Sequence, residues 1–309
     1  MDVVVSGASG LIGSALVPAL RAGGHTVRTL VRRPVRDDSE IRWDPLRGTL
    51  DPAALAEVDA VVHLAGAGVG DHRWTDRYKR RILDSRVAGT TLVAAAVAAA
   101  HPRPRVLLSA SAIGWYGDTG DRSVDESEPR GTGFLAEVTA AWEASTAAAE
   151  NAGVRVCHLR SGVVLSPHGG ALARQLPLFR LGLGGRLGSG RQWLSWITLA
   201  DETAAIIFLL TADGLRGPVN LTSPAPVTNT AFTRALGAAL RRRAILPVPA
   251  VALRIALGGF ADGGVLVSQR VLPRRLTEAG FTFSHADIDT ALGAVTAGTV
   301  TTGTSWPGS

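Results

Sequence analysis

The sequence predicts an α/β protein built on a doubly wound parallel sheet, and three observations support this prediction. Apolar strands alternate with helical patterns through the first half of the chain, which is typical of a parallel sheet covered on both faces. A glycine-rich turn joins the first strand directly to the first helix. The chain has 309 residues and is 46% hydrophobic, which is enough for a sizeable core in one large domain or two modest ones.

The first half alternates strands and helices in order along the chain. Short apolar, β-branched runs predict the strands, and segments with one apolar or Ala-rich face predict the helices between them. Right-handed crossovers would join the parallel strands. The predicted strands are Asp2–Val5, Thr26–Val31, Ile41–Trp43, Ala60–Leu64, Arg105–Ser109 and Arg155–Leu159. The predicted helices are Leu11–Ala22, Pro52–Glu57, Thr75–Ala100 and Gly133–Asn151.

The second half is less regular and predicts a smaller, mixed C-terminal portion. Residues 167–196 are rich in glycine and proline, so we expect an irregular stretch that serves as a binding segment or lid, or that has no role. Residues 296–309 are rich in Gly, Thr and Ser and predict a flexible tail. The other predicted elements are the helices Leu199–Ala212, Asn229–Arg241 and Ala250–Gly258 and the strand Pro218–Leu221.

The glycine-rich turn has the spacing Gly7-x-x-Gly10-x-x-Gly13 between a strand and a helix. A dinucleotide site requires glycines there, because the backbone turns sharply, approaches a pyrophosphate and lets the helix pack against the sheet. The free amides at the start of the helix then face the anion. An ordinary strand–turn–helix is the alternative. We predict dinucleotide contacts from Gly7, Ser9, Gly10, Leu11, Ile12 and Gly13.

The end of the second predicted strand indicates which dinucleotide is bound. An acidic residue there would hold the ribose 2′-hydroxyl of NAD, whereas arginine accommodates the additional phosphate of NADP. Here the sequence is Val31-Arg32-Arg33-Pro34, without Asp or Glu. Arg32 and Arg33 favour NADP(H) over NAD(H), because guanidinium groups form charge-assisted hydrogen bonds with phosphate. The alternative is that both arginines only end a strand at the surface.

The composition argues against several other classes of function. The net charge is +6, but the basic residues are dispersed and lack interleaved aromatic residues, so we expect no nucleic-acid partner. The single Cys157 forms no internal disulfide, and the seven histidines lack metal-ligand spacing, so we expect no metal site. We find no signal segment and no 18-residue apolar run, and therefore expect no membrane segment and a cytoplasmic location.

Several motifs occur in an order that is highly specific: GASGLIG at 7–13, DAVVHLAG at 59–66, SASAIGWYG at 109–117, GSGRQWLSW at 188–196 and NLTSPAPVTN at 220–229. Over nearly the whole chain the sequence resembles the extended short-chain dehydrogenases/reductases, and within them the atypical, sugar-nucleotide epimerase-like branch. The resemblance implies a Rossmann dinucleotide-binding domain over residues 1–162, to which residues 197–222 return. It also implies a small substrate domain over residues 163–196 and 223–295.

The resemblance implies further cofactor contacts at the ends of later strands. Leu64, Ala65 and Gly66 close the second motif, and Ser109 opens the third. Arg86 stands where ordinary members of the family have an asparagine in a long helix. Its guanidinium would place a positive charge near the cofactor or the reaction site, or would form a buried ion pair.

The same family uses a Tyr-x-x-x-Lys pair, in which the lysine lowers the pKa of the tyrosine so that the phenol exchanges a proton with substrate. The resemblance places this pair at Phe134 and Val138, neither of which can transfer a proton. The chain has only two tyrosines, Tyr78 and Tyr116, and a single lysine, Lys79, and none has the required spacing.

Ser111 and Tyr116 are the predicted catalytic residues. Ser111 matches the upstream serine of the family and would hydrogen-bond a substrate carbonyl or hydroxyl, unless it only satisfies backbone groups. Tyr116 can donate a hydrogen bond in place of the missing acid, or form a wall of the substrate pocket. We interpret Glu143 as one partner of a structural salt bridge and His63 as a core histidine.

The glycine-rich segment also carries Arg186, Arg191 and Gln192, which can bind an anionic substrate such as a nucleotide sugar or belong to a solvated lid. We predict an NADP(H)-dependent oxidoreductase or epimerase-like protein that transfers a hydride on a small carbonyl or hydroxyl substrate. The alternative is a catalytically silent NADP(H)-binding sensor or scaffold, which the missing Tyr–Lys pair favours. A homodimer is compatible with both.

Overall fold

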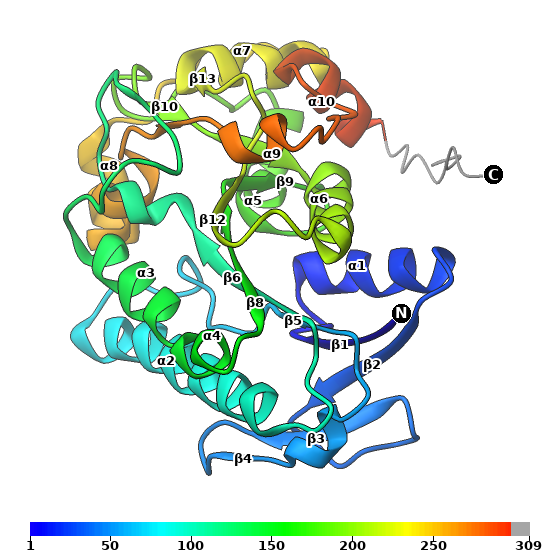
Figure 1. Ribbon diagram of the computed structural model, residues 1–309. Coiled ribbons are helices and arrows are strands. Elements are labelled where there is room, and N and C mark those ends of the chain that lie inside the picture. Colours follow the sequence, from blue (N-terminus) through cyan, green and yellow to red (C-terminus); the bar gives the residue numbers. More distant parts are fainter. Residues whose placement is uncertain (298–309) are drawn as a thin grey trace.

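A computed structural model describes residues 1–297 and shows an eight-stranded sheet at the centre of the fold (Figure 1). The strand order is β12-β8-β6-β5-β1-β2-β3-β4, and only the pair β3–β4 is antiparallel. The predicted fold class, an α/β protein with a doubly wound parallel sheet, is confirmed. The strands are β1 (Asp2–Ser6), β2 (Thr26–Val31), β3 (Glu40–Asp44), β4 (Thr49–Leu50), β5 (Ala60–His63), β6 (Val106–Ala112), β8 (Arg155–Ser161) and β12 (Gly217–Leu221).

Helices cover both faces of this sheet, and each face has its own apolar core. Leu16 and Ile206 are completely buried on one face, and Val93 and Val97 are completely buried on the other. The central strand β1 is apolar and buried throughout its middle because both of its faces are covered. The first face carries α1 (Leu11–Ala22) and α6 (Leu199–Thr211), and the second carries α2 (Asp76–Ala99), α3 (Phe134–Ala144) and α4 (Ala147–Asn151).

Most elements of the first half lie where the sequence predicts them, with two corrections. The helix predicted over Gly133–Asn151 is two helices, because the hydroxyls of Ser145 and Thr146 donate to carbonyls of the preceding turn and compete with the helical hydrogen bonds. The helix predicted over Pro52–Glu57 is a single 3-10 turn, η1 (Pro52–Leu55), because the last predicted residue has a positive φ of 62°.

Residues 167–196 are more regular than predicted. A helix forms here, and it buries Leu172, Leu176 and Phe179, whose spacing is that of one helix face. The smaller elements are η2 (Ile113–Tyr116), β7 (Ser123–Val124), β9 (Val163–Leu165), α5 (Gly170–Arg180), β10 (Trp193–Leu194), β11 (Trp196–Thr198), β13 (Val227–Thr228), α7 (Asn229–Ala239), α8 (Ala250–Leu257), η3 (Ala261–Val265), β14 (Arg270–Val271), α9 (Arg274–Glu278) and α10 (Ile288–Thr296).

The chain returns to the main sheet after these insertions. β12 pairs with β8, and α6 packs against α1. In the first turn of α6, the buried carboxylate of Asp201 accepts the backbone amides of Ser284 at 2.8 Å and His285 at 3.0 Å. These two bonds connect the segment before α10 to α6, which packs on the main sheet. The flexible tail predicted from residue 296 is wrong at Thr296, which ends α10, and residues 298–309 lie outside the described residues.

Within residues 1–297 one helix, α2, is long and apolar enough to cross a bilayer by length and composition, whereas the sequence analysis expects no such apolar run. Its residues Val93 and Val97 pack against the sheet, and Ile82 packs against α3. The chain therefore uses α2 as a core helix of the fold.

Glu202 follows Asp201 in α6 and is a fully buried carboxyl group with one hydrogen-bond partner. The Ser161 hydroxyl at the end of β8 donates to Glu202 Oε1 at 2.5 Å, and Oε2 has no partner among the described residues. Burial raises the pKa of Glu202 to about 8, although the hydrogen bond from Ser161 opposes this shift. The side chain is therefore an uncharged acid at neutral pH.

Glu202→Gln should remove a pH-dependent loss of stability. The glutamate pKa is about 4.3 in an unfolded chain, so the unfolded state releases this proton at a lower pH than the folded state does. This group therefore lowers the free energy of unfolding by about 1.4 kcal/mol per pH unit between about pH 5 and pH 8. Urea titrations of both proteins over this range should show a difference that grows with pH, whereas parallel profiles would contradict the assignment.

Candidate functional site

The turn between β1 and α1 allows only glycine at two of its positions. Gly7 has a φ of +69°, and a Cβ on it would lie 2.9 Å from the backbone nitrogen of Ala65. A Cβ on Gly13 would lie 2.3 Å from the carbonyl oxygen of Gly7 and 2.7 Å from Cα of Ala8. Side-chain carbons do not pack that closely against backbone atoms, so α1 can approach β1 only with glycine there. This is the close helix–strand packing that the motif predicts.

The start of α1 is open to an anion. Its N-cap residue, Gly10, has no side chain to satisfy the first helical amides, and Ser9 and Gly10 are exposed. The carboxyl ends of β1 and β5 are paired, with Ser6 opposite His63, so the segment 64–66 lies beside the glycine turn. A pyrophosphate binds where backbone amides lack partners and no side chain fills the space beside them. The turn has both features and therefore fits a dinucleotide.

His63 and Ser109 are register partners on β5 and β6, and both are buried. The Nδ1 atom of His63 shares a hydrogen bond of 2.7 Å with the hydroxyl of Ser6, and burial lowers the pKa of His63 to about 4. This supports the interpretation of His63 as a neutral core histidine. The Ser109 hydroxyl has no partner among the described residues, and its contact with a cofactor stays a prediction.

The two arginines after β2 differ in their surroundings. Arg33 forms a bidentate ion pair with the carboxylate of Glu40 on β3, in which Nη1 donates to Oε2 at 2.6 Å. Arg32 is exposed, and the described part of the chain offers it no hydrogen bond or ion pair. Of this pair, only Arg32 has a guanidinium free of internal partners.

Arg86 is buried without a carboxylate beside it. Its Nη1 atom donates to the carbonyls of Ala67 at 2.9 Å and Ile82 at 3.1 Å, and its guanidinium carbon lies 4.7 Å from the ring centre of Trp142. Burial lowers the pKa of Arg86 to about 10, so the group stays charged at neutral pH. Within residues 1–297 no acidic group pairs with it, so the alternative of a buried ion pair is wrong.

The positions of the missing proton-transfer pair are occupied by an apolar cluster. Val138 is buried against Tyr78 of α2, and the ring of Phe134 packs edge-on against Trp74 at 5.0 Å between centres. Lys79, the single lysine of the chain, lies over Phe134 with Nζ 5.3 Å from the ring centre. These contacts join α3 to α2, and neither Phe134 nor Val138 can donate a proton.

A buried polar network lies at the carboxyl ends of β6 and β8. The Ser111 hydroxyl donates to Glu143 Oε1 at 2.6 Å. Arg160 holds the same carboxylate through two bonds, from Nε to Oε1 at 2.7 Å and from Nη2 to Oε2 at 2.8 Å. Arg160 Nη1 also donates to the Tyr116 hydroxyl at 3.1 Å. The structural salt bridge expected of Glu143 is confirmed, with Arg160 as its partner.

Tyr116 is held in this network by two bonds and is almost completely buried. Its hydroxyl donates to Asn220 Oδ1 at 2.8 Å and accepts from Arg160. Burial raises the pKa of Tyr116 to about 12, even with the Arg160 charge beside it. The phenol is therefore neutral throughout the physiological pH range and cannot serve as a base. Trp115 stacks on the other face of the network, 4.0 Å from the guanidinium carbon of Arg160.

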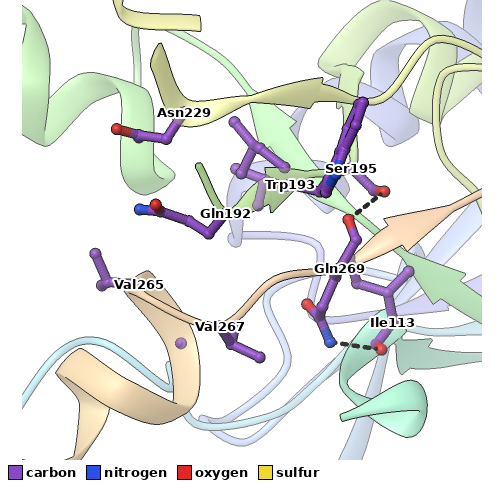
Figure 2. A pocket seen from close by; sticks show the side chains of 11 residues that line it. Ile113, Gln192, Trp193, Ser195, Asn229, Val265, Val267 and Gln269 are labelled. Carbon is purple, nitrogen blue, oxygen red and sulfur yellow. Dashed lines mark hydrogen bonds between the residues drawn. The ribbon is translucent and has the colours of Figure 1, made fainter. Parts of the chain in front are cut away.

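A small cavity of about 40 Å³ lies between the glycine-rich segment and residues 264–269 (Figure 2). Gln269 lines it and bonds to Ile113 and Ser195. Its side-chain Nε2 atom donates to the backbone carbonyl of Ile113 at 3.0 Å. Its backbone carbonyl accepts from the Ser195 hydroxyl at 2.9 Å. Of the three residues predicted to bind an anionic substrate, Gln192 lines this cavity and Arg186 and Arg191 do not.

Arg160 and Asn220 belong to the site but are not among the residues predicted from the sequence. Arg160 stands in a buried strand, and a charged residue at such a position signals a partner. Asn220 is the first residue of the motif NLTSPAPVTN. Its contact with Tyr116 could not be predicted, because the two residues are 104 positions apart in the sequence.

The fold and the glycine turn define a dinucleotide-binding protein of the short-chain dehydrogenase/reductase type, and comparisons with known proteins agree. Residues 3–221 match the NAD dependent epimerase/dehydratase family, and residues 248–295 match a domain of unknown function, DUF1731. Epimerase family protein MT2273 of Mycobacterium tuberculosis is 51% identical over 294 residues, which cover 95% of this chain and 97% of that protein. Human epimerase family protein SDR39U1 is 34% identical over 300 residues, which cover 96% of this chain and 100% of that protein.

The crystal structure of human SDR39U1 (isoform 2) with NADPH has a TM-score of 0.90 to this structure at 33% identity. The match covers 97% of this chain and 100% of that chain. The chain therefore belongs to the NAD dependent epimerase/dehydratase family, as an atypical short-chain dehydrogenase/reductase. The resemblance drawn from its motifs is confirmed.

Gly13→Ala should destabilise the protein by roughly 1–3 kcal/mol, because the new methyl group forces α1 away from the carbonyl of Gly7. The matched control is Gly293→Ala in α10, where a Cβ meets no atom within 4 Å. That substitution should stabilise by about 0.5–1 kcal/mol, because alanine is the better helix former. Thermal unfolding of both variants tests the contrast, and equal shifts in Tm would contradict the packing argument.

Proposed function

We propose that the protein binds NADP(H) and transfers a hydride between it and a carbonyl or hydroxyl group of a small substrate, as a reductase or as an epimerase. The observation that carries the proposal is the position of the Ser111–Glu143–Arg160 network at the carboxyl ends of β6 and β8. Ligands of doubly wound sheets bind at this edge. The glycine turn follows the carboxyl end of β1 in the same sheet.

The proposed cofactor contacts lie in the glycine turn and at the neighbouring strand ends. We assign the 2′-phosphate to Arg32, which is exposed and lacks an internal partner, whereas Glu40 engages Arg33. The NADPH in the crystal structure of the human relative supports the same preference. The other proposed contacts are Gly7, Ser9, Gly10, Leu11, Ile12, Gly13, Leu64, Ala65, Gly66, Arg86 and Ser109.

When bound, the cofactor would supply or accept the hydride, and the proton that accompanies it would come from or go to solvent. The protein orients the substrate and stabilises charge. We assign substrate orientation to Ser111. Its hydroxyl donates to Glu143, so its oxygen is free to accept a hydrogen bond from a substrate hydroxyl. The ion pair with Arg160 fixes Glu143 and thereby the direction of the Ser111 hydroxyl. Tyr116 acts in this proposal as a hydrogen-bonding group and not as a base, because its phenol stays protonated.

Arg86 is proposed to supply the positive charge that the missing lysine would give. Trp142, against which its guanidinium lies, is one helical turn beyond Val138 on α3. The positive charge beside α3 is therefore supplied by Arg86, a residue of α2. A guanidinium has five N–H donors, and the contacts with Ala67 and Ile82 use only Nη1, so the remaining donors suit cofactor oxygens.

A second candidate function is a catalytically silent NADP(H)-binding sensor. The observation that favours it is the apolar cluster around Phe134 and Val138, which stands where the family would have its proton donor. Binding of NADP(H) is common to both functions, so turnover separates them.

Arg32→Ala should raise the Kd for NADPH by about tenfold or more and leave the Kd for NADH nearly unchanged, because only NADPH carries the 2′-phosphate. Arg33→Ala should change either Kd by less than about threefold, since its guanidinium is bonded to Glu40. Fluorescence titrations with both dinucleotides measure these constants. An equal loss for NADPH and NADH in Arg32→Ala would refute the phosphate assignment.

Oxidation of NADPH, followed at 340 nm with a panel of small ketones and nucleotide sugars, should reveal turnover that falls about 100-fold in Ser111→Ala. The variant should keep the NADPH affinity of the native chain, because Ser111 bonds to Glu143 and not to the glycine turn. Tight NADPH binding without turnover on any substrate of the panel would instead favour the sensor.

A further inference from the structure

A groove lined by arginines lies in the C-terminal part of the chain. This groove of about 560 Å³ runs between α7 and the segment 242–247. Arg186, Arg234 and Arg242 line it, together with the hydroxyl-bearing residues Thr230 and Thr233. The groove and the small cavity around Gln269 share no lining residue.

The arginines of this region are not matched by acidic residues in the same segments of the sequence. Residues 163–196 and 223–260 contain nine arginines and no aspartate or glutamate. Arg174 and Arg254, two of the nine, form ion pairs with acidic residues outside these segments. The three groove arginines have no carboxylate partner in the part of the chain that the structure describes. Three uncompensated guanidiniums around one groove favour an anionic ligand.

Two of these arginines are held in place by backbone carbonyls. Arg186 Nη1 donates to the carbonyls of Gly188 at 2.8 Å and Ser189 at 2.9 Å, and Arg242 Nε donates to the carbonyl of Arg180 at 3.0 Å. Carbonyl bonds orient a guanidinium without neutralising it, so the charge remains available to a ligand. A Cβ on Gly190 would lie 3.1 Å from Cδ of Arg186, so the glycine-rich loop leaves room for this arrangement.

The rest of the groove is apolar. Ala238, Ala244, Ile245 and Pro247 line it, and Ile245 is 70% exposed. A ligand that matches both the arginines and the apolar side chains carries a phosphate group and an organic portion. Guanidiniums pair with phosphate oxygens, and the apolar side chains can pack against carbon atoms of the ligand.

We propose that this groove is a binding site for a phosphate ester, separate from the dinucleotide cradle and from the small cavity. The site is independent of the proposed hydride transfer. None of its lining residues belongs to the Ser111 network or to the glycine turn, so substitutions in the groove should leave the dinucleotide affinity unchanged.

Inorganic pyrophosphate is the first probe, titrated calorimetrically into the full chain. Arg234→Gln/Arg242→Gln should weaken the binding at least tenfold. The matched control is Arg241→Gln/Arg243→Gln, which removes the same charge from neighbouring arginines that do not line the groove. The control should bind like the native chain. Arg234→Gln alone, which breaks no internal hydrogen bond in residues 1–297, should give a smaller loss and separates ligand binding from folding defects.

The outcomes are distinct. Equal losses in the two double variants would overturn the proposal, because they would show attraction by net charge alone. Pyrophosphate binding that only Gly13→Ala abolishes would also overturn it, since the dinucleotide cradle would then be the site. Sedimentation with phosphatidylglycerol vesicles distinguishes the source of the phosphate: vesicle binding lost with the groove variant supports a lipid headgroup, and pyrophosphate binding without vesicle binding supports a free phosphate ester.

Discussion

The close approach of α1 to β1 is the constraint on which the rest of the structure depends. Gly13 faces the carbonyl of Gly7 with no room for a side chain, and this brings α1 down onto the sheet. α6 packs beside α1 and leads the chain back into β12 at the sheet edge. The same contact leaves the first amides of α1 uncapped at the edge where the strands end. Packing and ligand binding therefore have a common origin in one turn.

The site combines the glycine turn with an apolar stretch of α3. Phe134 and Val138 contribute packing between α2 and α3, which a tyrosine and a lysine at these places would interrupt with polar groups. Polar function is concentrated instead one turn or more further along α3, where Trp142 contacts Arg86 and Glu143 binds Ser111 and Arg160. Arg86 of α2 and Arg160 of β8 thus place positive charge beside the second half of this helix.

Much of the sheet could be predicted from the sequence because short apolar, β-branched runs and glycine spacing are local signals. The cradle residues follow from the same local pattern. The helix α5 was harder to predict, because its glycine- and proline-rich surroundings conceal the spacing of Leu172, Leu176 and Phe179. The partners of Glu143 and Tyr116 could not be predicted at all, because they are set by strand register across β6, β8 and β12 and not by neighbours in the chain. The difference between Arg32 and Arg33 likewise depends on β3 lying beside β2.

The carboxylate of Asp201 carries a consequence for the modularity of the chain. It lies within residues 3–221, which match one family, but the amides it accepts come from Ser284 and His285, within residues 248–295, which match another. Division of the chain between the two matched regions would leave the buried carboxylate with the Thr198 hydroxyl but without its two amide donors, and those two amides would be unpaired in the other fragment. The boundary between the sequence families is therefore not a boundary between folding units, and the two regions are expected to be inherited together.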